Sequence, residues 1–121
     1  MSTEETVAAY LAAWNEPDAA ARHGLLERCW AAAGTYTDPM SHVDGRDALA
    51  AHIVQFQQQM PGARIARTSG IDEHHGRIRF AWSLRRPDGA PPIDGIDIGE
   101  LDADGRLRAI IGFFGPPPAL P

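Results

Sequence analysis

Two carboxylates and one phenol stand in this sequence where groups that exchange protons could do chemistry: Asp38, Asp97 and Tyr10. Asp38 follows the strand-forming run Thr35–Thr37 and precedes a proline. Asp97 lies in the middle of Gly95–Gly99, a stretch expected to be mostly covered, where a carboxylate is costly unless it is hydrogen-bonded or protonated. Tyr10 lies on the apolar face of an expected helix, so its hydroxyl needs a partner inside. Carboxyl and phenol groups accept and donate protons, so the chemistry that these residue types offer is acid–base catalysis.

Each of these residues also has a purely structural interpretation. Tyr10 could be a satisfied core tyrosine, Asp38 a cap or turn residue, and Asp97 a group on the solvated side of its strand. Other candidates are weaker, because the five histidines show no metal-ligand spacing and Cys29 lies on an apolar helical face, as small core residues do. The pair His74–His75 precedes a glycine and predicts a turn. No metal site is expected.

Three helices are expected to position these residues. Ser2 and Glu5 resemble a capping box that starts the first helix, which should end near Asn15–Pro17. Asp18 can cap the second helix, and Pro61–Gly62 should end the third. The expected core-facing residues are Leu25, Leu26, Cys29, Trp30 and Ala33 on the second helix, and Leu49, Ile53, Phe56 and Met60 on the third.

A polar loop is expected from Pro39 to Gly45, before the third helix. From Ala63 onward the hydrophobic pattern changes from period 3.6 to period 2, which indicates strands. The predicted strands are Arg77–Arg85, Ile93–Leu101 and Arg106–Phe114, with turns between them. Helices followed by a curled antiparallel sheet predict an α+β domain.

Length and composition limit the class of protein. The 121 residues fit a single domain, residues 1–115, followed by the proline-rich tail 116–121. A net charge of -5 at pH 7 and the lack of a basic cluster argue against nucleic acid or an anionic membrane as a partner. The chain has no lysine, which excludes Schiff-base chemistry through a lysine amine. The lone Cys29 and an acidic N-terminus without a signal-peptide pattern favour the cytoplasm.

Six segments carry a resemblance to a known superfamily. They are AAYLAAWNEPD, YTDP and GRDALAAHI in the first half, and FAW, IDGID and DGRLRAIIGFFG in the second. Together they run over nearly the whole chain, from Thr6 to Gly115, and resemble the nuclear transport factor 2-like superfamily. This superfamily has a cone-shaped, cystatin-like fold and includes ketosteroid isomerases and SnoaL-like polyketide cyclases. The resemblance implies three helices packed on a strongly curved antiparallel or mixed sheet that encloses an apolar pocket.

The resemblance also implies roles for the three polar residues. Asp38 falls on the general base of the isomerases, Tyr10 on their oxyanion-hole tyrosine and Asp97 on their protonated oxyanion-hole aspartic acid. The resemblance thus implies an isomerase that moves a double bond in a steroid-like hydrophobic ketone: the base would transfer a proton through an enolate, and the two donors would stabilise the enolate oxygen. The implied reaction needs no cofactor. The residues expected to bind substrate are Trp14, Phe56, Phe80, Trp82 and Phe114.

Other functions remain open within this superfamily. A SnoaL-like polyketide cyclase would also react through an enolate, and the fold also hosts proteins that only bind hydrophobic small molecules. The loop Pro39–Gly45 is about two residues shorter than in the steroid enzymes, judged by its turn and helix signals. The ligand expected is therefore a small hydrophobic ketone or polyketide-like molecule. Because relatives commonly pair through the convex face of the sheet, a homodimer is implied.

Overall fold

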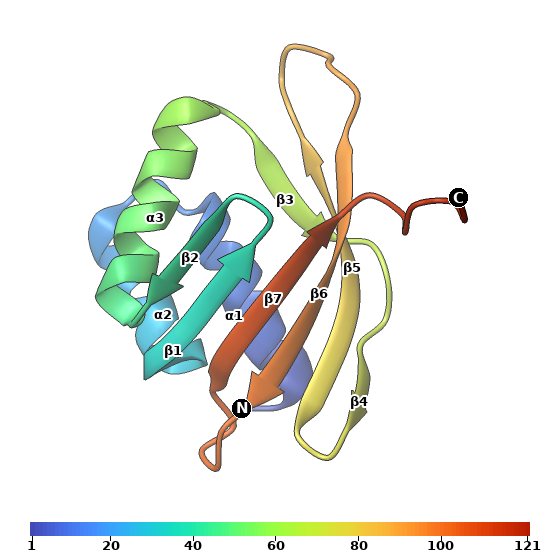
Figure 1. Ribbon diagram of the computed structural model, residues 1–121. Helices are drawn as coiled ribbons and strands as arrows, with labels where there is room; N and C mark the ends of the chain where they lie inside the picture. The colour runs from blue at the N-terminus through green and yellow to red at the C-terminus, as the bar shows by residue number, and fades with distance from the viewer.

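Three helices and seven strands make up the chain in a computed structural model that describes residues 1–121 (Figure 1). Their order is α1 (Thr3–Asn15), α2 (Ala19–Cys29), β1 (Trp30–Asp38), β2 (Ser41–Asp44), α3 (Arg46–Gln59), β3 (Arg64–Arg67), β4 (Asp72–His74), β5 (Arg77–Arg85), β6 (Ile93–Leu101) and β7 (Leu107–Phe114). The predicted α+β class is confirmed. No helix is long and apolar enough to cross a membrane.

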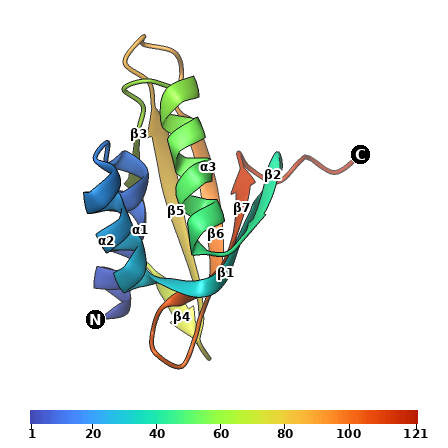
Figure 2. The ribbon, with the colours of Figure 1, turned by 90° about the vertical axis from the view of Figure 1, so that its left-hand side faces the viewer.

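All strands join one mixed sheet in the order β2-β1-β7-β6-β5-β3, with β4 paired to β5 beside this path. The only parallel pair is β1 with β7, and the other neighbours are antiparallel. The sheet curves around the helices, so that β1 and β2 lie beside α3 while β3 lies beside α1 (Figures 1 and 2). This curvature gives the molecule a cone-like shape (Figures 1 and 2).

The predicted helix signals are confirmed in detail. The hydroxyl of Ser2 accepts a hydrogen bond from the Glu5 N–H at 3.1 Å, and the Glu5 carboxylate accepts one from the Ser2 N–H at 2.9 Å. Asp18 caps α2 by accepting from the Ala21 N–H at 2.8 Å. The third helix ends at Gln59, just before the predicted proline–glycine stop. These local interactions fix where α1 and α2 begin.

The predicted end of the second helix is wrong. The sequence pattern predicts Trp30 and Ala33 on its apolar face, but α2 stops at Cys29 and both residues belong to β1. The cause is long-range: Trp30 pairs with Leu107 of β7, and its carbonyl oxygen accepts from Arg46 Nε at 3.0 Å and Nη2 at 2.6 Å. Alanine-rich sequence is a good helix former on its own, so sheet pairing overrides local propensity here.

The predicted loop from Pro39 to Gly45 is also partly wrong, because residues 41–44 form strand β2. They pair with β1 in an antiparallel hairpin that aligns Thr37 with His42 and Asp38 with Ser41. The hairpin lies at the edge of the sheet, where polar side chains face solvent and hide the strand signal. The site of Asp38 is therefore a hairpin turn.

The later strands match their predicted bounds. β5 and β6 match the predicted ranges, and β7 begins one residue later than expected, at Leu107. The predicted inward face of β5 is buried throughout; it consists of Ile78, Phe80, Trp82 and Leu84. The predicted turn after β4 is also present, with His75 at a positive φ of 51°. Period-2 alternation identifies these strands because one face of the sheet is covered and the other is not.

Candidate functional site

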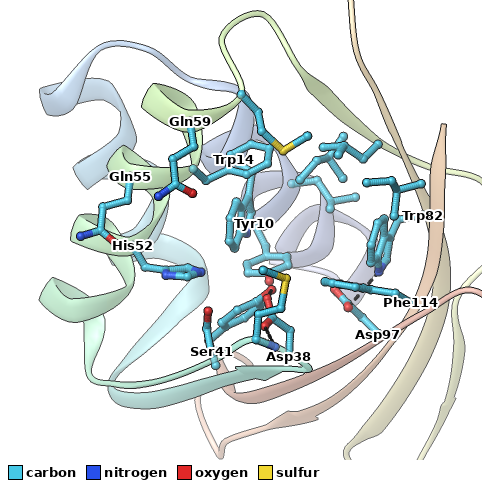
Figure 3. A pocket seen from close by; sticks show the side chains of 18 residues that line it. Tyr10, Trp14, Asp38, Ser41, His52, Gln55, Gln59, Trp82, Asp97 and Phe114 are labelled. Atoms are coloured by element: carbon cyan, nitrogen blue, oxygen red, sulfur yellow. Dashed lines mark hydrogen bonds between the residues drawn. The ribbon is translucent and has the colours of Figure 1, made fainter. Parts of the chain in front are cut away.

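A cavity of about 420 Å³ lies between the helices and the concave face of the sheet (Figure 3). It is lined by 18 residues, 12 of them hydrophobic, which is typical of sites for small apolar molecules. Seven of the eight predicted site residues meet in its wall: Tyr10, Trp14, Asp38, Phe56, Trp82, Asp97 and Phe114. They come from α1, β1, α3, β5, β6 and β7, so the cavity is a product of the whole fold.

Phe80 is the predicted substrate-binding residue that the structure does not bring to the cavity. It is 1% exposed, belongs to the hydrophobic core and is not among the lining residues. Phe80 and Trp82 point to the same side of β5, since alternate residues of a strand share a face. Only Trp82 lies at the end of the strand where the hollow opens. The shared face was readable in the sequence, but the position of the hollow was not.

Asp97 is a buried acid at one end of the cavity, with only 6% of its surface exposed. Its Oδ1 accepts a hydrogen bond from the indole N–H of Trp82 at 2.9 Å. Burial raises the pKa of Asp97 to about 7; the Trp82 hydrogen bond lowers it in part, and the negative charge of Asp38 raises it further. A carboxyl group with such a pKa holds its proton in a large fraction of molecules at neutral pH and can then donate a hydrogen bond.

Two glycines make room for this arrangement. A Cβ atom on Gly95 would lie 2.2 Å from the ring of Trp82, so only glycine lets the indole lie across β6 toward Asp97. A Cβ atom on Gly112 of β7 would lie 3.0 Å from Asp97 Oδ1 and 3.7 Å from the Cβ of Asp38. The two acids therefore flank the same glycine. This proximity follows from the pairing of the strands. Gly112 of β7 pairs with Asp97 of β6. The residue before Gly112 pairs on the other side with Thr37 of β1, which directly precedes Asp38.

Asp38 sits at the hairpin turn with both carboxylate oxygens engaged. Oδ1 accepts a hydrogen bond from the Met40 N–H at 2.8 Å, and Oδ2 accepts one from the Tyr36 hydroxyl at 2.6 Å. Each carboxylate oxygen has two lone pairs, so a further proton can still be accepted. The two bonds fix the orientation of the carboxylate, as a base that must meet one particular carbon–hydrogen bond requires.

Tyr36 is a site residue that sequence reasoning missed. It is buried in the cavity wall, and its pKa is raised far above the ordinary value, chiefly by burial and then by the hydrogen bond to Asp38 and nearby negative charge. It therefore remains a phenol and acts as a donor. A signal was available in the strand pattern, since residues two apart on a strand point to the same side and Tyr36 precedes Asp38 by two.

Tyr10 is 1% exposed and lies in the cavity wall, stacked on Trp30 with ring centroids 5.5 Å apart. Burial, followed by the charge of Asp97, raises its pKa well above the ordinary value, so its hydroxyl also remains a donor. The hydrogen bonds between the side chains of the site join Tyr36 to Asp38 and Trp82 to Asp97. Tyr10 takes part in neither. The side chain of Trp14 lowers the pKa of Tyr10 in part, as a hydrogen-bond donor does, and a donor leaves the phenol hydrogen free for a ligand.

Aromatic rings form much of the remaining wall. The rings of Trp82 and Phe114 meet edge to face at 5.8 Å, and those of Trp14 and Phe56 do so at 5.3 Å. Cys29, in contrast, lies in the core away from the cavity lining, and burial raises the pKa of its thiol to about 12. The interpretation of Cys29 as a small core residue is therefore confirmed.

Polar residues of α3 form a part of the wall that was not predicted. His52, Gln55 and Gln59 line the cavity on the side opposite Asp97 and Trp82 (Figure 3). Their spacing of three and four residues places them on one face of the helix. This spacing was visible in the sequence, but it is also the pattern of an ordinary solvated face. Only the cavity distinguishes the two interpretations.

Comparisons with known proteins agree with this architecture. A family model described as a SnoaL-like domain matches residues 7–110. A solved structure from Agrobacterium tumefaciens, a candidate isomerase of the SnoaL-like family, is 35% identical with a TM-score of 0.85, and the match covers 92% of this chain and 95% of that one. No curated protein sequence matches the chain.

More distant structures share the fold. A protein with a cystatin-like fold from Methylobium petroleophilum is 19% identical with a TM-score of 0.78, over 97% of this chain and 78% of that one. A candidate polyketide cyclase from Sinorhizobium meliloti is 11% identical with a TM-score of 0.73, over 93% of this chain and 99% of that one. At these identities the likeness concerns the fold alone.

Proposed function

The chain belongs to the SnoaL-like family of the nuclear transport factor 2-like superfamily, and we propose that it is a cofactor-independent isomerase that moves a double bond in a hydrophobic ketone. One observation carries the proposal: two carboxyl groups flank Gly112 in an apolar cavity, and their surroundings differ. Asp38 accepts two hydrogen bonds, whereas burial raises the pKa of Asp97 to about 7. Two acids in such different surroundings are suited to act as one base and one hydrogen-bond donor.

The proposed reaction uses each group in turn. The Asp38 carboxylate removes a proton from the carbon next to the ketone carbonyl, and the electrons of the broken C–H bond move to the carbonyl oxygen. The hydroxyl of Tyr10 and the protonated carboxyl of Asp97 donate hydrogen bonds to that oxygen. Asp38 then returns the proton to the far carbon of the dienolate, which moves the double bond into conjugation. Removal of one such oxyanion donor typically lowers the rate by about 10²–10³.

Tyr36 supports the base in this scheme as a positioning residue. Its hydroxyl donates to Asp38 Oδ2 at 2.6 Å while Met40 holds Oδ1, so the carboxylate cannot rotate freely. After Asp38 takes up the proton, the carboxyl group remains in place for the return step. Return to a different carbon needs only a small shift of substrate or base, because a single carbon atom separates the carbon that loses the proton from the carbon that receives it.

The test is ultraviolet detection of conjugated enone formation from a β,γ-unsaturated ketosteroid and from a smaller monocyclic β,γ-unsaturated ketone. Asp38→Asn should lower the rate by about 10²–10⁴, the usual contribution of a general base. Asp44→Asn is the matched control, because Asp44 is exposed on the same hairpin and does not line the cavity. Equal rates in the wild type and Asp38→Asn, or equal losses in both variants, would contradict the proposal.

A SnoaL-like cyclase is the second candidate, and the polar side of the cavity favours it. An aldol cyclisation also starts when a base forms an enolate, so Asp38, Tyr10 and Asp97 would keep their roles. His52, Gln55 and Gln59 suit a ligand with more oxygen atoms than a simple ketone. A folded protein that binds phenols but isomerises neither test ketone would favour this candidate, or a protein that only binds ligands.

We also propose that the chain forms a homodimer through the outer face of the sheet. Phe113 and Ile111 on β7 are 57% and 45% exposed, and they pair with Ile96 and Ile98 of β6. Ile96 and Ile98 are half-buried, so two exposed apolar side chains stand beside two partly exposed ones, and such apolar patches are typical of protein interfaces. Light scattering should give the mass of a dimer for the wild type and of a monomer for Phe113→Asp. A monomeric wild type would refute this proposal.

A further inference from the structure

The polar groups of the cavity are divided between two sides. Asp97 lies on the sheet side, with Trp82 and Phe114 beside it, whereas Gln55 and Gln59 project from α3 on the opposite side (Figure 3). Apolar and aromatic side chains fill much of the wall between them. A ligand long enough to reach across the cavity therefore meets one polar region at each end.

The two glutamines on the α3 side are available to a ligand. Gln57 of the same helix is fully used by the fold: its Nε2 donates to the carbonyl oxygens of Trp14 at 3.1 Å and Glu16 at 2.9 Å, and its Oε1 accepts from Arg22 at 3.4 Å. Gln55 and Gln59 also line the cavity, but their side chains form no such bonds to the protein, and both residues are exposed to solvent. A free amide offers both a donor and an acceptor, so it can bind a hydroxyl or a carbonyl oxygen.

The cavity also lacks a fixed positive charge. None of its 18 lining residues is an arginine, and the chain contains no lysine. A carboxylate or phosphate placed inside the cavity, beside the buried Tyr10 and Asp97, would lose its hydration without gaining an ionic partner, which is costly. The negative charge of Asp38, which contributes to the raised pKa of Asp97, would also repel an anionic ligand. The wall therefore favours uncharged ligands.

We infer that the cavity takes an uncharged ligand that carries oxygen at both ends: the reacting ketone against Asp97 and Tyr10, and a hydroxyl or second carbonyl against Gln55 and Gln59. This inference rests on the proposed function in one respect, the placing of the ketone at the Asp97 end. It names Gln55 and Gln59 as specificity-determining residues. A ketone with a purely hydrocarbon far end leaves both amides without a ligand partner.

Binding of matched phenols tests the inference, because a phenol mimics the enolate oxygen without reacting. The first pair of probes is 2-naphthol and 2,6-dihydroxynaphthalene; the second is a phenolic steroid with and without a hydroxyl on the ring farthest from the phenol. In calorimetric titrations of the wild type, we expect the doubly oxygenated member of at least one pair to bind about two- to tenfold tighter, as one net hydrogen bond allows. The anion 6-hydroxy-2-naphthoate should bind more weakly than 2,6-dihydroxynaphthalene.

The double variant Gln55→Leu/Gln59→Leu should lose the preference and keep its affinity for the singly oxygenated probe. Gln58→Leu is the matched control, because Gln58 is an exposed glutamine of the same helix that does not line the cavity. Equal affinities within both pairs in the wild type, or a preference that survives in the double variant, would overturn the inference, as would tighter binding of the carboxylate. These readouts need no turnover, so a failed enone assay with a glutamine-dependent preference would refute the isomerisation and keep the ligand class.

Discussion

Replacement of Asp97 by asparagine should change how the stability of the protein depends on pH. The amide has nearly the same shape, and its oxygen can still accept the 2.9 Å hydrogen bond from Trp82, but it cannot ionise. In the folded wild type, the pKa of Asp97 is raised from 3.8 to about 7, chiefly by burial. At about 1.4 kcal/mol per pH unit, this difference corresponds to about 4 kcal/mol between the protonated and ionised forms.

The sign of the effect follows from which state binds the proton more tightly. The folded protein holds the Asp97 proton more tightly than the unfolded chain, so protonation of this group favours folding. Its stabilising contribution is complete below about pH 4, decreases as the pH rises toward 7, and is absent above that. Asp97→Asn lacks this contribution. The free energy of unfolding of the variant minus that of the wild type should therefore rise by up to about 4 kcal/mol between pH 4 and pH 8.

Urea unfolding followed by tryptophan fluorescence measures this difference at a series of pH values. The comparison of the variant with the wild type removes the contributions of all other ionisable groups that titrate alike in both proteins. Asp94→Asn is the control, because Asp94 is exposed on the same strand, and its difference from the wild type should stay flat over the range. A flat difference for Asp97→Asn as well would refute the reasoning, because it would show that Asp97 ionises alike in the folded and unfolded states.

Three further outcomes are expected. Turnover by the wild type should fall as the pH rises above about 7, because Asp97 then loses the proton it donates, and a rate that keeps rising to pH 9 would contradict its role. Gly112→Ala should lower turnover at least tenfold and destabilise the protein by about 1–3 kcal/mol, because its Cβ would lie 3.0 Å from Asp97 Oδ1. Turnover and urea unfolding measure the two effects. The control Gly70→Ala should show neither effect, because the space around Gly70 is open. Tyr36→Phe should lower the free energy of unfolding by about 1.5–3 kcal/mol and lower kcat more than it raises KM, because Asp38 loses its 2.6 Å hydrogen bond. Urea unfolding and steady-state kinetics measure the two effects, and an unchanged stability or an unchanged kcat would contradict this role of Tyr36.

The sequence by itself determined the local elements and the types of residue at the site. Capping at Ser2 and Asp18 placed the starts of α1 and α2, and the period-2 pattern placed β5 and β6, because these signals depend on residues close together in the chain. Position along the chain identified Asp38, Asp97 and Tyr10 as candidates, and the resemblance to a superfamily implied their roles. Where the cavity lies, and which side chains meet in it, could not be deduced from residues close together in the chain.

The tertiary structure alone decided how these groups meet. The parallel pairing of β1 with β7, and the register of β7 against β6, bring Asp38 and Asp97 to the two sides of Gly112. The same pairing ends α2 at Cys29, against the helical preference of the alanines that follow. Neither result is visible locally, because register is set by burial of a whole sheet face and by partners that are distant in sequence. The raised pKa of Asp97 has the same origin, since it depends mainly on how completely the assembled cavity removes water from that carboxyl group.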